Sequence, residues 1–372
     1  MKILIAPDSF KGTLTASEVC DIVGQAFRNR INDSEIMKLP AADGGEGLCA
    51  CFREIMGGET VKTEVCGVFG EKITAEYLVL EDNTAVIEMA TCAGFPLAGE
   101  NKNPEKATTF GVGELINHAV KNNAKKILLG LGGSATNDCG LGMASALGWI
   151  FTDENGAEFI PTGETMYKLR KIAKPENLID IPVIAACDVD NPLYGENGAA
   201  YVFAPQKGAD TDMVKRLDSG LRHTAEIINN ELNIDVSEIK GAGAAGGMGA
   251  AAVAFLGAEL KRGIDIILDA AEFDEKAADA DLIITGEGRL DFQSVNGKVI
   301  SGIAKRAAMQ NKKVIAICGS RGEGAEKIKE LGVSELYFSC ETDKPFDEIT
   351  KTCHEDLYNV AVKAAENANK RG

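Results

Sequence analysis

Short loops that combine an acidic residue with glycine recur along this chain, and each follows a stretch that is typical of a β-strand. The four loops are APDSFKG (6–12), ADGGEG (42–47), CDVDNPLYG (187–195) and TGEGRLD (285–291). Loops at the carboxyl ends of parallel strands converge on one crevice. We therefore expect these acidic residues to gather there: Asp8, Asp43, Asp188, Asp190, Glu287 and Asp291. Like charges oppose each other's ionisation, so a divalent cation or cationic side chains must relieve the repulsion. Magnesium prefers carboxylates, water and phosphates, which favours chemistry on a nucleotide phosphate.

A glycine-rich stretch, LLGLGGSATNDCGLGMASALG (128–148), predicts an anion-binding turn. It runs from an apolar strand through Gly132, Gly133 and Ser134 into a helix of small residues. The first turn of a helix offers unpaired N–H donors and the positive end of the helix dipole, which suit a negatively charged group. A tight turn with nothing bound is the alternative explanation of the same glycines.

Two segments come close to the glycine fingerprint of dinucleotide-binding proteins. Gly130, Gly132 and Ala135 fit GxGxxA after a strand, whereas GAGAAG (241–246) fits GxGxxG but follows a polar, broken stretch. A nicotinamide site is therefore the weaker alternative. The chain has no P-loop, because Phe292 occupies the position of the first glycine before NGK.

The acidic and basic candidates also have structural explanations. Asp8 and Asp43 are of the type that caps helices and turns. Asp188 and Asp190 are spaced to share one face of a strand end, although Asp-Asn-Pro also makes a plain turn. The planar guanidinium of Arg289 suits bidentate holding of a carboxylate or a phosphate.

The formal charge of −17 makes nucleic acid and anionic membranes poor partners. It permits a small anionic substrate, because salt screens the overall field within about 8 Å. Basic residues inside glycine-rich stretches are therefore informative: Lys11, Lys207, Arg289 and Lys298.

The cysteines point to a reducing compartment. Ten cysteines are scattered without a CxxC pair, and three histidines cannot supply the usual zinc spacings. We expect reduced, mostly buried thiols in a cytoplasmic protein. No apolar run approaches the roughly 18 residues of a membrane span, and the short run in MKILIAPDSFKG predicts a first strand rather than a secretory signal.

Both ends of the chain alternate strand and helix. Predicted strands are KILIA (2–6), EIMKL (35–39), DLIIT (281–285), KVIAIC (313–318) and ELYF (335–338). Thr15 and Glu18 predict a capping box, followed by an apolar helix face. In the middle, KITAEYLVLEDNTAVIEMA (72–90) predicts a hairpin around Asp82 and Asn83.

This pattern predicts an α/β fold with two domains. Residues 1–66 and 270–372 are expected to form a Rossmann-like, doubly wound parallel-sheet domain. Residues 67–269 are expected to form an inserted mixed α/β domain, with the active site in the cleft between the two.

Taken in order, these segments resemble the signature segments of the class I glycerate kinases and cover nearly the whole chain. The segments are APDSFKGTLTASEV, ADGGEG, LGLGGSATNDCGLGMASALG, CDVDNPLYGENGAAYVFAPQKGA, GAGAAGGMGAA and LIITGEGRLDFQSVNGK. Cys139 is one departure, at a position where a small residue such as glycine is expected. The resemblance implies ATP-dependent phosphorylation of D-glycerate to 2-phosphoglycerate, two α/β domains with the site between them, and a role in organic-acid catabolism.

Given that activity, the chemistry of the residues suggests which of them bind ATP and magnesium. The turn at Gly132, Gly133 and Ser134 is expected to offer backbone N–H groups to the ATP phosphates. The turn at Gly246 and Gly247 is expected to do the same. Asp188 or Asp190 is expected to hold Mg²⁺, directly or through water.

The substrate side has its own candidates. Lys11 and Arg289 are expected to divide the glycerate carboxylate and the γ-phosphate between them, in an order that the sequence leaves open. Asp43, or failing it Asp8, is expected to accept the proton of the C2 hydroxyl. The expected substrate-binding set also includes Ser9, Gly44, Gly45, Glu287 and Asp291.

Other activities stay open at this point. They are phosphorylation at the 3-position of glycerate, a nicotinamide-dependent hydroxy-acid dehydrogenase, and a nucleotide-binding module without catalysis. The expected partners are glycerate and ATP rather than nucleic acid or membrane, and pairing of two copies as a homodimer is left open.

Overall fold

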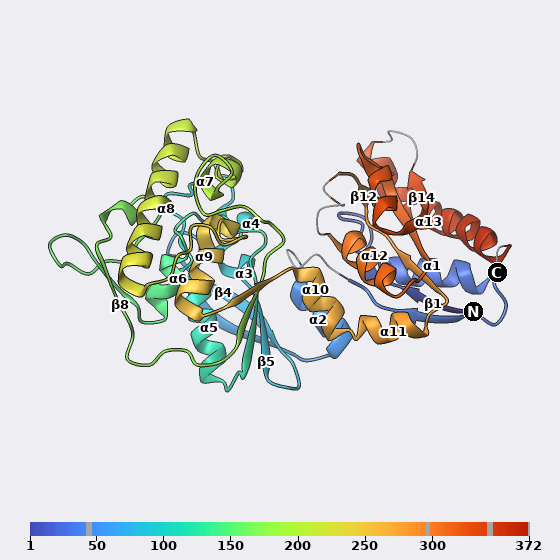
Figure 1. The fold of residues 1–372 in the computed structure, drawn as a ribbon, viewed down its shortest axis with the longest axis horizontal. Coiled ribbons are helices and arrows are strands. Elements are labelled where there is room, and N and C mark those ends of the chain that lie inside the picture. Colours follow the sequence, from blue (N-terminus) through green and yellow to red (C-terminus); the bar gives the residue numbers. More distant parts are fainter. Residues whose placement is uncertain (42–46, 293, 295–297, 341–344, 371–372) are drawn as a thin grey trace. The chain divides into compact units, whose positions relative to one another are not determined.

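The computed structural model describes residues 1–41, 47–292, 294, 298–340 and 345–370. The chain divides into two compact units, each with its own sheet (Figure 1). Unit 1 comprises Met1–Asp43, Glu54–Met56 and Ile264–Gly372, and unit 2 comprises Gly44–Arg53 and Gly57–Gly263. The predicted fold class is confirmed, because a doubly wound parallel sheet draws on both chain ends and a mixed α/β region is inserted between them.

The sheet of unit 1 has the order β2-β1-β11-β13-β14, and every strand pair in it is parallel. Its strands are β1 (Lys2–Ile5), β2 (Glu35–Lys38), β11 (Leu282–Thr285), β12 (Arg289–Leu290), β13 (Val314–Arg321) and β14 (Val333–Cys340). Ser320 of β13 pairs with Arg289 of β12 and with Cys340 of β14. Because β14 occupies one edge of β13, the short β12 pairs with the other edge, beyond the end of β11.

Alternating side chains bury both faces of this sheet. Along β1, Ile3 and Ile5 join one hydrophobic cluster with α1 and α13, while Leu4 joins another with α10 to α12 and η3. The covering helices are α1 (Ala16–Arg28), α10 (Gly263–Ala270), α11 (Phe273–Asp279), α12 (Val299–Met309), η3 (Ala325–Leu331) and α13 (Phe346–Asn369). Figure 1 shows α1 and α13 side by side. Helix α1 begins with the predicted capping box of Thr15 and Glu18, which is confirmed.

The connections of unit 1 run in two directions from the middle of the sheet. From β1 the chain passes through α1 to β2, whereas from β11 it passes through α12, on the opposite face, to β13. The connections that follow β1 and β11 therefore lead to opposite faces of the sheet, an arrangement that favours a crevice beyond the carboxyl ends of the two strands.

Unit 2 contains a mixed sheet of order β10-β9-β6-β5-β4-β3, in which the pairs β3-β4 and β4-β5 are antiparallel and the remaining pairs are parallel. The antiparallel pair β4 and β5 confirms the predicted hairpin. Its strands are β3 (Glu59–Cys66), β4 (Lys72–Val79), β5 (Thr84–Glu88), β6 (Lys126–Gly130), β9 (Val183–Ala186) and β10 (Glu259–Lys261), with β7 (Ile150–Thr152) and β8 (Lys171–Ala173) as a separate pair.

The helices of unit 2 pack with this sheet around one large hydrophobic cluster. They are α2 (Leu48–Met56), whose last turn belongs to unit 1, α3 (Ala90–Ala93), α4 (Phe95–Ala98), α5 (Phe110–Lys121), α6 (Leu141–Ala146), η1 (Met166–Lys168), α7 (Ala199–Phe203), η2 (Pro205–Lys207), α8 (Thr211–Leu232) and α9 (Ala244–Leu256). No helix in the described part of the chain has both the length and the apolarity to cross a membrane.

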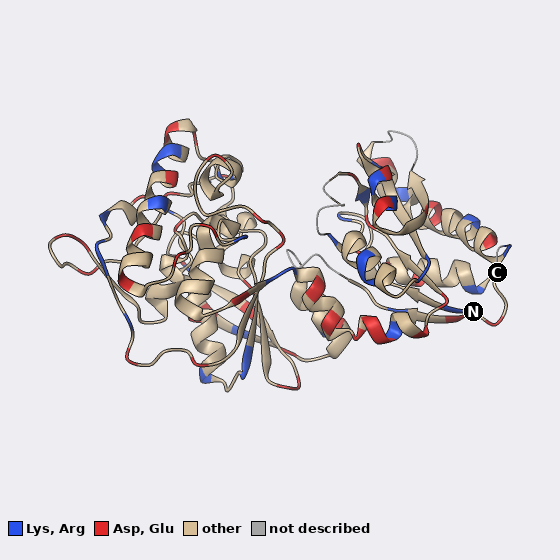
Figure 2. Cartoon of the chain, in the orientation of Figure 1, with Lys and Arg blue, Asp and Glu red and all other residues tan. Residues whose placement is uncertain are grey.

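Many of the acidic residues serve the surface rather than a site. Figure 2 shows acidic residues along α10 and α11. Arg306 of α12 pairs with three of them, Asp265, Asp269 and Asp274, at 3.3, 2.6 and 3.2 Å. This part of the negative charge is therefore accounted for by solvated helix faces and one shared arginine.

Candidate active site

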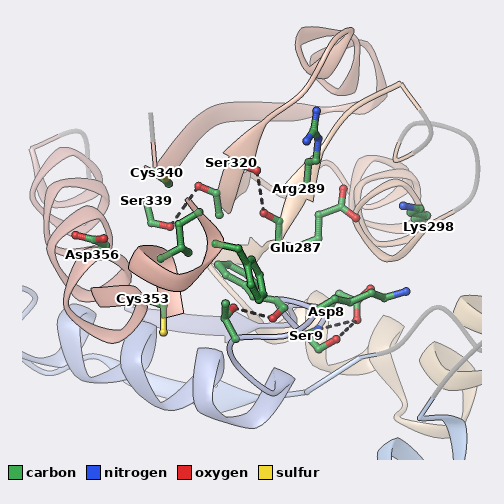
Figure 3. A pocket seen from close by; sticks show the side chains of 17 residues that line it. Asp8, Ser9, Glu287, Arg289, Lys298, Ser320, Ser339, Cys340, Cys353 and Asp356 are labelled. Atoms are coloured by element: carbon green, nitrogen blue, oxygen red, sulfur yellow. Dashed lines mark hydrogen bonds between the residues drawn. The ribbon is translucent and has the colours of Figure 1, made fainter. Parts of the chain in front are cut away.

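A cavity of about 410 Å³ lies in unit 1, lined by the loops that follow β1 and β11 (Figure 3). It is lined by Asp8, Ser9, Phe10, Lys11, Thr13, Glu287, Gly288, Arg289, Lys298, Gly319, Ser320, Ser339, Cys340, Phe346, Ile349, Cys353 and Asp356. Five residues predicted from the sequence thus line one space: Asp8, Ser9, Lys11, Glu287 and Arg289. Asp291, a sixth, lies close enough to Glu287 to raise the pKa of its carboxyl.

The backbone holds the two loops against each other. Asp8 N donates to Gly286 O at 2.8 Å, which extends the pairing of β1 and β11 beyond the strands. A Cβ on Gly288 would lie 3.1 Å from Phe10 Cα, so the second loop packs directly on the first. These contacts hold the loops after β1 and β11 together where they line the cavity.

Glu287 is the most deeply buried acidic group of this cavity, with 4% of the residue exposed. The pKa of its carboxyl is raised to about 7, mainly by burial. Ser294 and Lys298 oppose this increase, whereas nearby Asp8 and Asp291 add to it. Figure 3 shows the Glu287 carboxyl turned toward Lys298, while the Arg289 side chain extends in another direction.

Asp8 is also buried, but its carboxylate is already used locally. Asp8 Oδ1 accepts hydrogen bonds from Ser9 N at 2.6 Å and from Ser9 Oγ at 3.3 Å. Lys11 is exposed, three residues further along the same loop. The cavity therefore combines two buried carboxylates with the cationic side chains of Lys11, Arg289 and Lys298 at its wall.

In unit 2, the predicted Gly-Gly-Ser turn follows β6 as expected, but the helix begins later than predicted. Helix α6 begins at Leu141 rather than directly after Ser134. The intervening Asp138 is fully buried and accepts hydrogen bonds from Gly140 N at 3.1 Å and Gly142 N at 3.3 Å. The first amides of this helix are thus satisfied by the protein's own carboxylate.

A buried lysine supports the turn itself. Lys207 Nζ donates to Ser134 Oγ and to Thr136 O, both at 2.8 Å. Only 3% of Lys207 is exposed, and burial lowers the pKa of its ammonium group to about 7 although Asp138 opposes the shift. Gly132 and Gly133, which come directly before Ser134, are half-buried.

The second glycine-rich turn packs against the first segment. Gly246 has a φ of +72°, and a Cβ there would lie 2.1 Å from Thr136 O. Cys139 N donates to Gly246 O at 3.1 Å. The two predicted glycine turns are therefore neighbours within unit 2, and close packing alone requires glycine at position 246.

Asp188 and Asp190 follow β9, and both take part in contacts near the end of unit 2. Asp188 Oδ1 accepts from Gly263 N at 2.9 Å, and Asp190 pairs with Arg262 at 3.5 Å. In the described part of the chain, no group of three or more His, Cys, Asp or Glu side chains could hold a metal ion. A cation here would need most of its ligands from elsewhere.

The comparison with known proteins now decides the family. The model of the glycerate kinase family matches residues 3–369. This chain belongs to the glycerate kinase family. A relative from Bacillus cereus named glycerate kinase is 43% identical, over 98% of this chain and 97% of its own. One from Escherichia coli K12 named glycerate 2-kinase is 42% identical over the same shares.

A solved structure extends the similarity to the whole fold. The chain is similar to a crystal structure of a candidate glycerate kinase 2 from Salmonella typhimurium LT2, with a TM-score of 0.88 and 40% identity. The match covers 100% of this chain and 98% of that one. Membership of a kinase family implies ATP as the phosphoryl donor. The resemblance inferred from the sequence is thereby confirmed.

Some predicted site residues of this glycerate kinase family member lie outside the described residues, namely Asp43, Gly44 and Gly45. Three further residues of these sites were not given a role from the sequence. Lys298 faces Glu287, and Lys207 lies under the Gly-Gly-Ser turn, although both had been singled out only as basic residues near glycine. Asp138 was missed, and the signal that could have found it is an acidic residue two positions before Gly140, the αL glycine at the N-cap of α6.

Proposed function

We propose that this chain transfers the γ-phosphoryl group of ATP to the C2 hydroxyl of D-glycerate, giving 2-phosphoglycerate and ADP. The observation that carries the proposal is the cavity in which Asp8, Ser9, Lys11, Glu287 and Arg289 converge. The family match and the E. coli relative named glycerate 2-kinase support the same reaction.

Glycerate is a small anion with two hydroxyl groups, and the cavity offers groups that complement each part. The planar fork of Arg289 suits the carboxylate, and Lys11 suits an entering phosphate as a compact positive charge. Asp8 and Ser9, held together by their hydrogen bonds, would accept and donate hydrogen bonds to the hydroxyls. Phosphoryl transfer depends mainly on such positioning and on charge stabilisation.

We assign the phosphates of ATP to the Gly-Gly-Ser turn of unit 2. Gly132 and Gly133 are half-buried, so their backbone could meet a phosphate, and Ser134 is held from behind by Lys207. Gly246 and Gly247 are buried against the first segment and would act by fixing its shape.

Magnesium is part of the proposal, with Asp188 as its protein ligand and Asp190 as the alternative. Mg²⁺ is commonly held by one or two carboxylates together with substrate phosphates and water, which fits two acidic residues without a larger cluster. When bound, the ion neutralises charge that develops on the phosphates. Asp188 would position it while keeping the hydrogen bond from Gly263 N.

We also propose that the protein works in the cytoplasm on small molecules. Eight of the ten cysteines are buried, as expected of thiols in a reducing compartment. The charge of −17 opposes binding to nucleic acid or anionic lipid.

A coupled assay tests the reaction and its position. The protein is incubated with ATP, Mg²⁺ and D-glycerate, and the product is offered to enolase with and without phosphoglycerate mutase. Conversion by enolase alone is expected for 2-phosphoglycerate. Dependence on the mutase would instead establish the 3-phosphate, and the absence of glycerate-dependent ADP formation would reject the kinase proposal.

A further inference from the structure

The cavity of unit 1 contains two buried carboxylates whose surroundings differ. Asp8 Oδ1 already accepts two hydrogen bonds from Ser9. Glu287 Oε1 is buried and has no hydrogen-bond partner among the described residues. A buried carboxylate oxygen without a donor is costly, so such an atom is retained where it serves a purpose.

The backbone at Glu287 is held rigidly. Glu287 O accepts from Gly319 N at 3.0 Å, and Gly288 O accepts from Ser320 N at 2.9 Å, both from β13. On the other side, Gly286 O accepts from Asp8 N at 2.8 Å. A Cβ on Gly286 would lie 1.9 Å from Ile317 O, so only glycine fits at the position before Glu287. A side chain on this frame is positioned more accurately than one on a free loop.

The groups that face Glu287 come from every element around it, and they are of both signs. They are Asp8 from the β1 loop, Asp291 and Ser294 from its own loop, Lys298 at the start of α12, and the Cys318 thiol of β13. Burial, together with two acidic neighbours and one cation, leaves the protonated and ionised forms of Glu287 close in free energy near pH 7. A group of this kind can both take up and release a proton near neutral pH.

We infer that Glu287 Oε1 is the atom that accepts the proton of the attacking hydroxyl, with Asp8 and Ser9 orienting the substrate beside it. This assignment rests on the proposed kinase function and replaces Asp43 and Asp8 as the expected base. As the hydroxyl oxygen forms a bond to the γ-phosphorus, the bond from phosphorus to the β,γ-bridging oxygen breaks. ADP leaves with that electron pair, and the hydroxyl proton passes to Glu287 and then to solvent.

The test compares Glu287→Gln with the wild type in single-turnover and steady-state assays from pH 5.5 to 9. Loss of the proton acceptor is expected to lower kcat by about 10²–10⁴-fold while KM for glycerate changes a few-fold or less. The wild type should lose kcat/KM on the acid side of about pH 7, and this limb should be absent from the residual activity of the variant. Glu330→Gln, the same change on exposed η3, serves as the matched control and should behave as wild type.

Folding and function are separated by two further measurements. Glu287→Gln removes a buried carboxylate, so its melting temperature at pH 8 should equal or exceed that of the wild type. Glu287→Asp should recover part of kcat and restore the acid limb, which a merely structural side chain would not do. A Glu287→Gln variant with more than one tenth of wild-type kcat, or with an unchanged acid limb, would overturn the assignment. If the wild type itself makes no phosphorylated glycerate, the proposed function fails instead.

Discussion

Lys207 Nζ donates a hydrogen bond of 2.8 Å to Ser134 Oγ, joining the end of η2 to the glycine turn after β6. Its second hydrogen bond goes to Thr136 O, two residues further along the same segment. An ammonium group buried this deeply loses its hydration, and this loss lowers the pKa of Lys207 to about 7. The turn is therefore supported by a lysine whose ammonium group loses its proton near neutral pH in the folded protein.

Replacing Lys207 with methionine should change how stability depends on pH. In the unfolded chain a lysine keeps its usual pKa of 10.5, so between pH 7 and 10.5 the unfolded state binds more protons than the folded state. The wild type should therefore gain stability as pH rises, by up to about 2 kcal/mol between pH 7 and 9, relative to Lys207→Met. Urea unfolding at both pH values measures this difference, with the exposed Lys215→Met as control. Parallel curves for all three proteins would contradict it.

Asp138 provides a second prediction, with a matched control elsewhere in unit 2. Asp138 Oδ2 accepts from Thr109 N and Thr109 Oγ1, both at 2.8 Å, in a fully buried setting. Asp82 accepts from Thr84 N and Thr84 Oγ1, both at 2.9 Å, at the surface. Asp138→Asn should lower the free energy of unfolding by about 2–4 kcal/mol and Asp82→Asn by about 1 kcal/mol or less. Equal losses in urea titrations would show that burial does not matter here.

The features that could be predicted from the sequence were those set by local pattern. The capping box at Thr15, the hairpin of β4 and β5, and the strands of unit 1 other than the short β12 follow from spacing that needs no tertiary information. The convergence of the β1 and β11 loops was also predictable, because parallel strands place their carboxyl ends together. This rule predicted that Asp8 and Glu287 lie close together, and both line the same cavity.

The features that escaped prediction depend on tertiary contacts. Lys207 lies in a PQKG segment that is typical of a solvated loop, and only packing of η2 against the 134–136 segment buries it. Helix α6 begins late because Asp138 caps it from inside, which shifts its first amides away from the turn. The wall formed by Phe346, Ile349 and Cys353 comes from α13, whose sequence shows only an amphipathic helix.

Lys11 should matter for turnover and not for folding. Its side chain is exposed on the cavity loop, so Lys11→Met should leave the melting temperature within about 2 °C of the wild type. Loss of a positive charge at the transferring phosphoryl group should lower kcat by about 10²-fold or more. Steady-state assays of glycerate-dependent ADP formation measure this, and Lys305→Met on the exposed side of α12 is the control. Near-normal kcat in Lys11→Met would remove Lys11 from the catalytic set.

Asp188 should determine how much magnesium the enzyme needs. Asparagine at this position keeps an oxygen that can accept from Gly263 N, so Asp188→Asn should fold normally while losing the charge that attracts the ion. The free Mg²⁺ concentration for half-maximal rate should rise about tenfold or more, since tenfold corresponds to only about 1.4 kcal/mol of binding free energy. Asp190→Asn should shift it less, because Asp190 is exposed and shares its charge with Arg262. Removing Mg²⁺ with EDTA should stop turnover in all three proteins. If Asp188→Asn and wild type give the same Mg²⁺ titration, the ion is held elsewhere, and the larger effect in Asp190→Asn would transfer the role to Asp190.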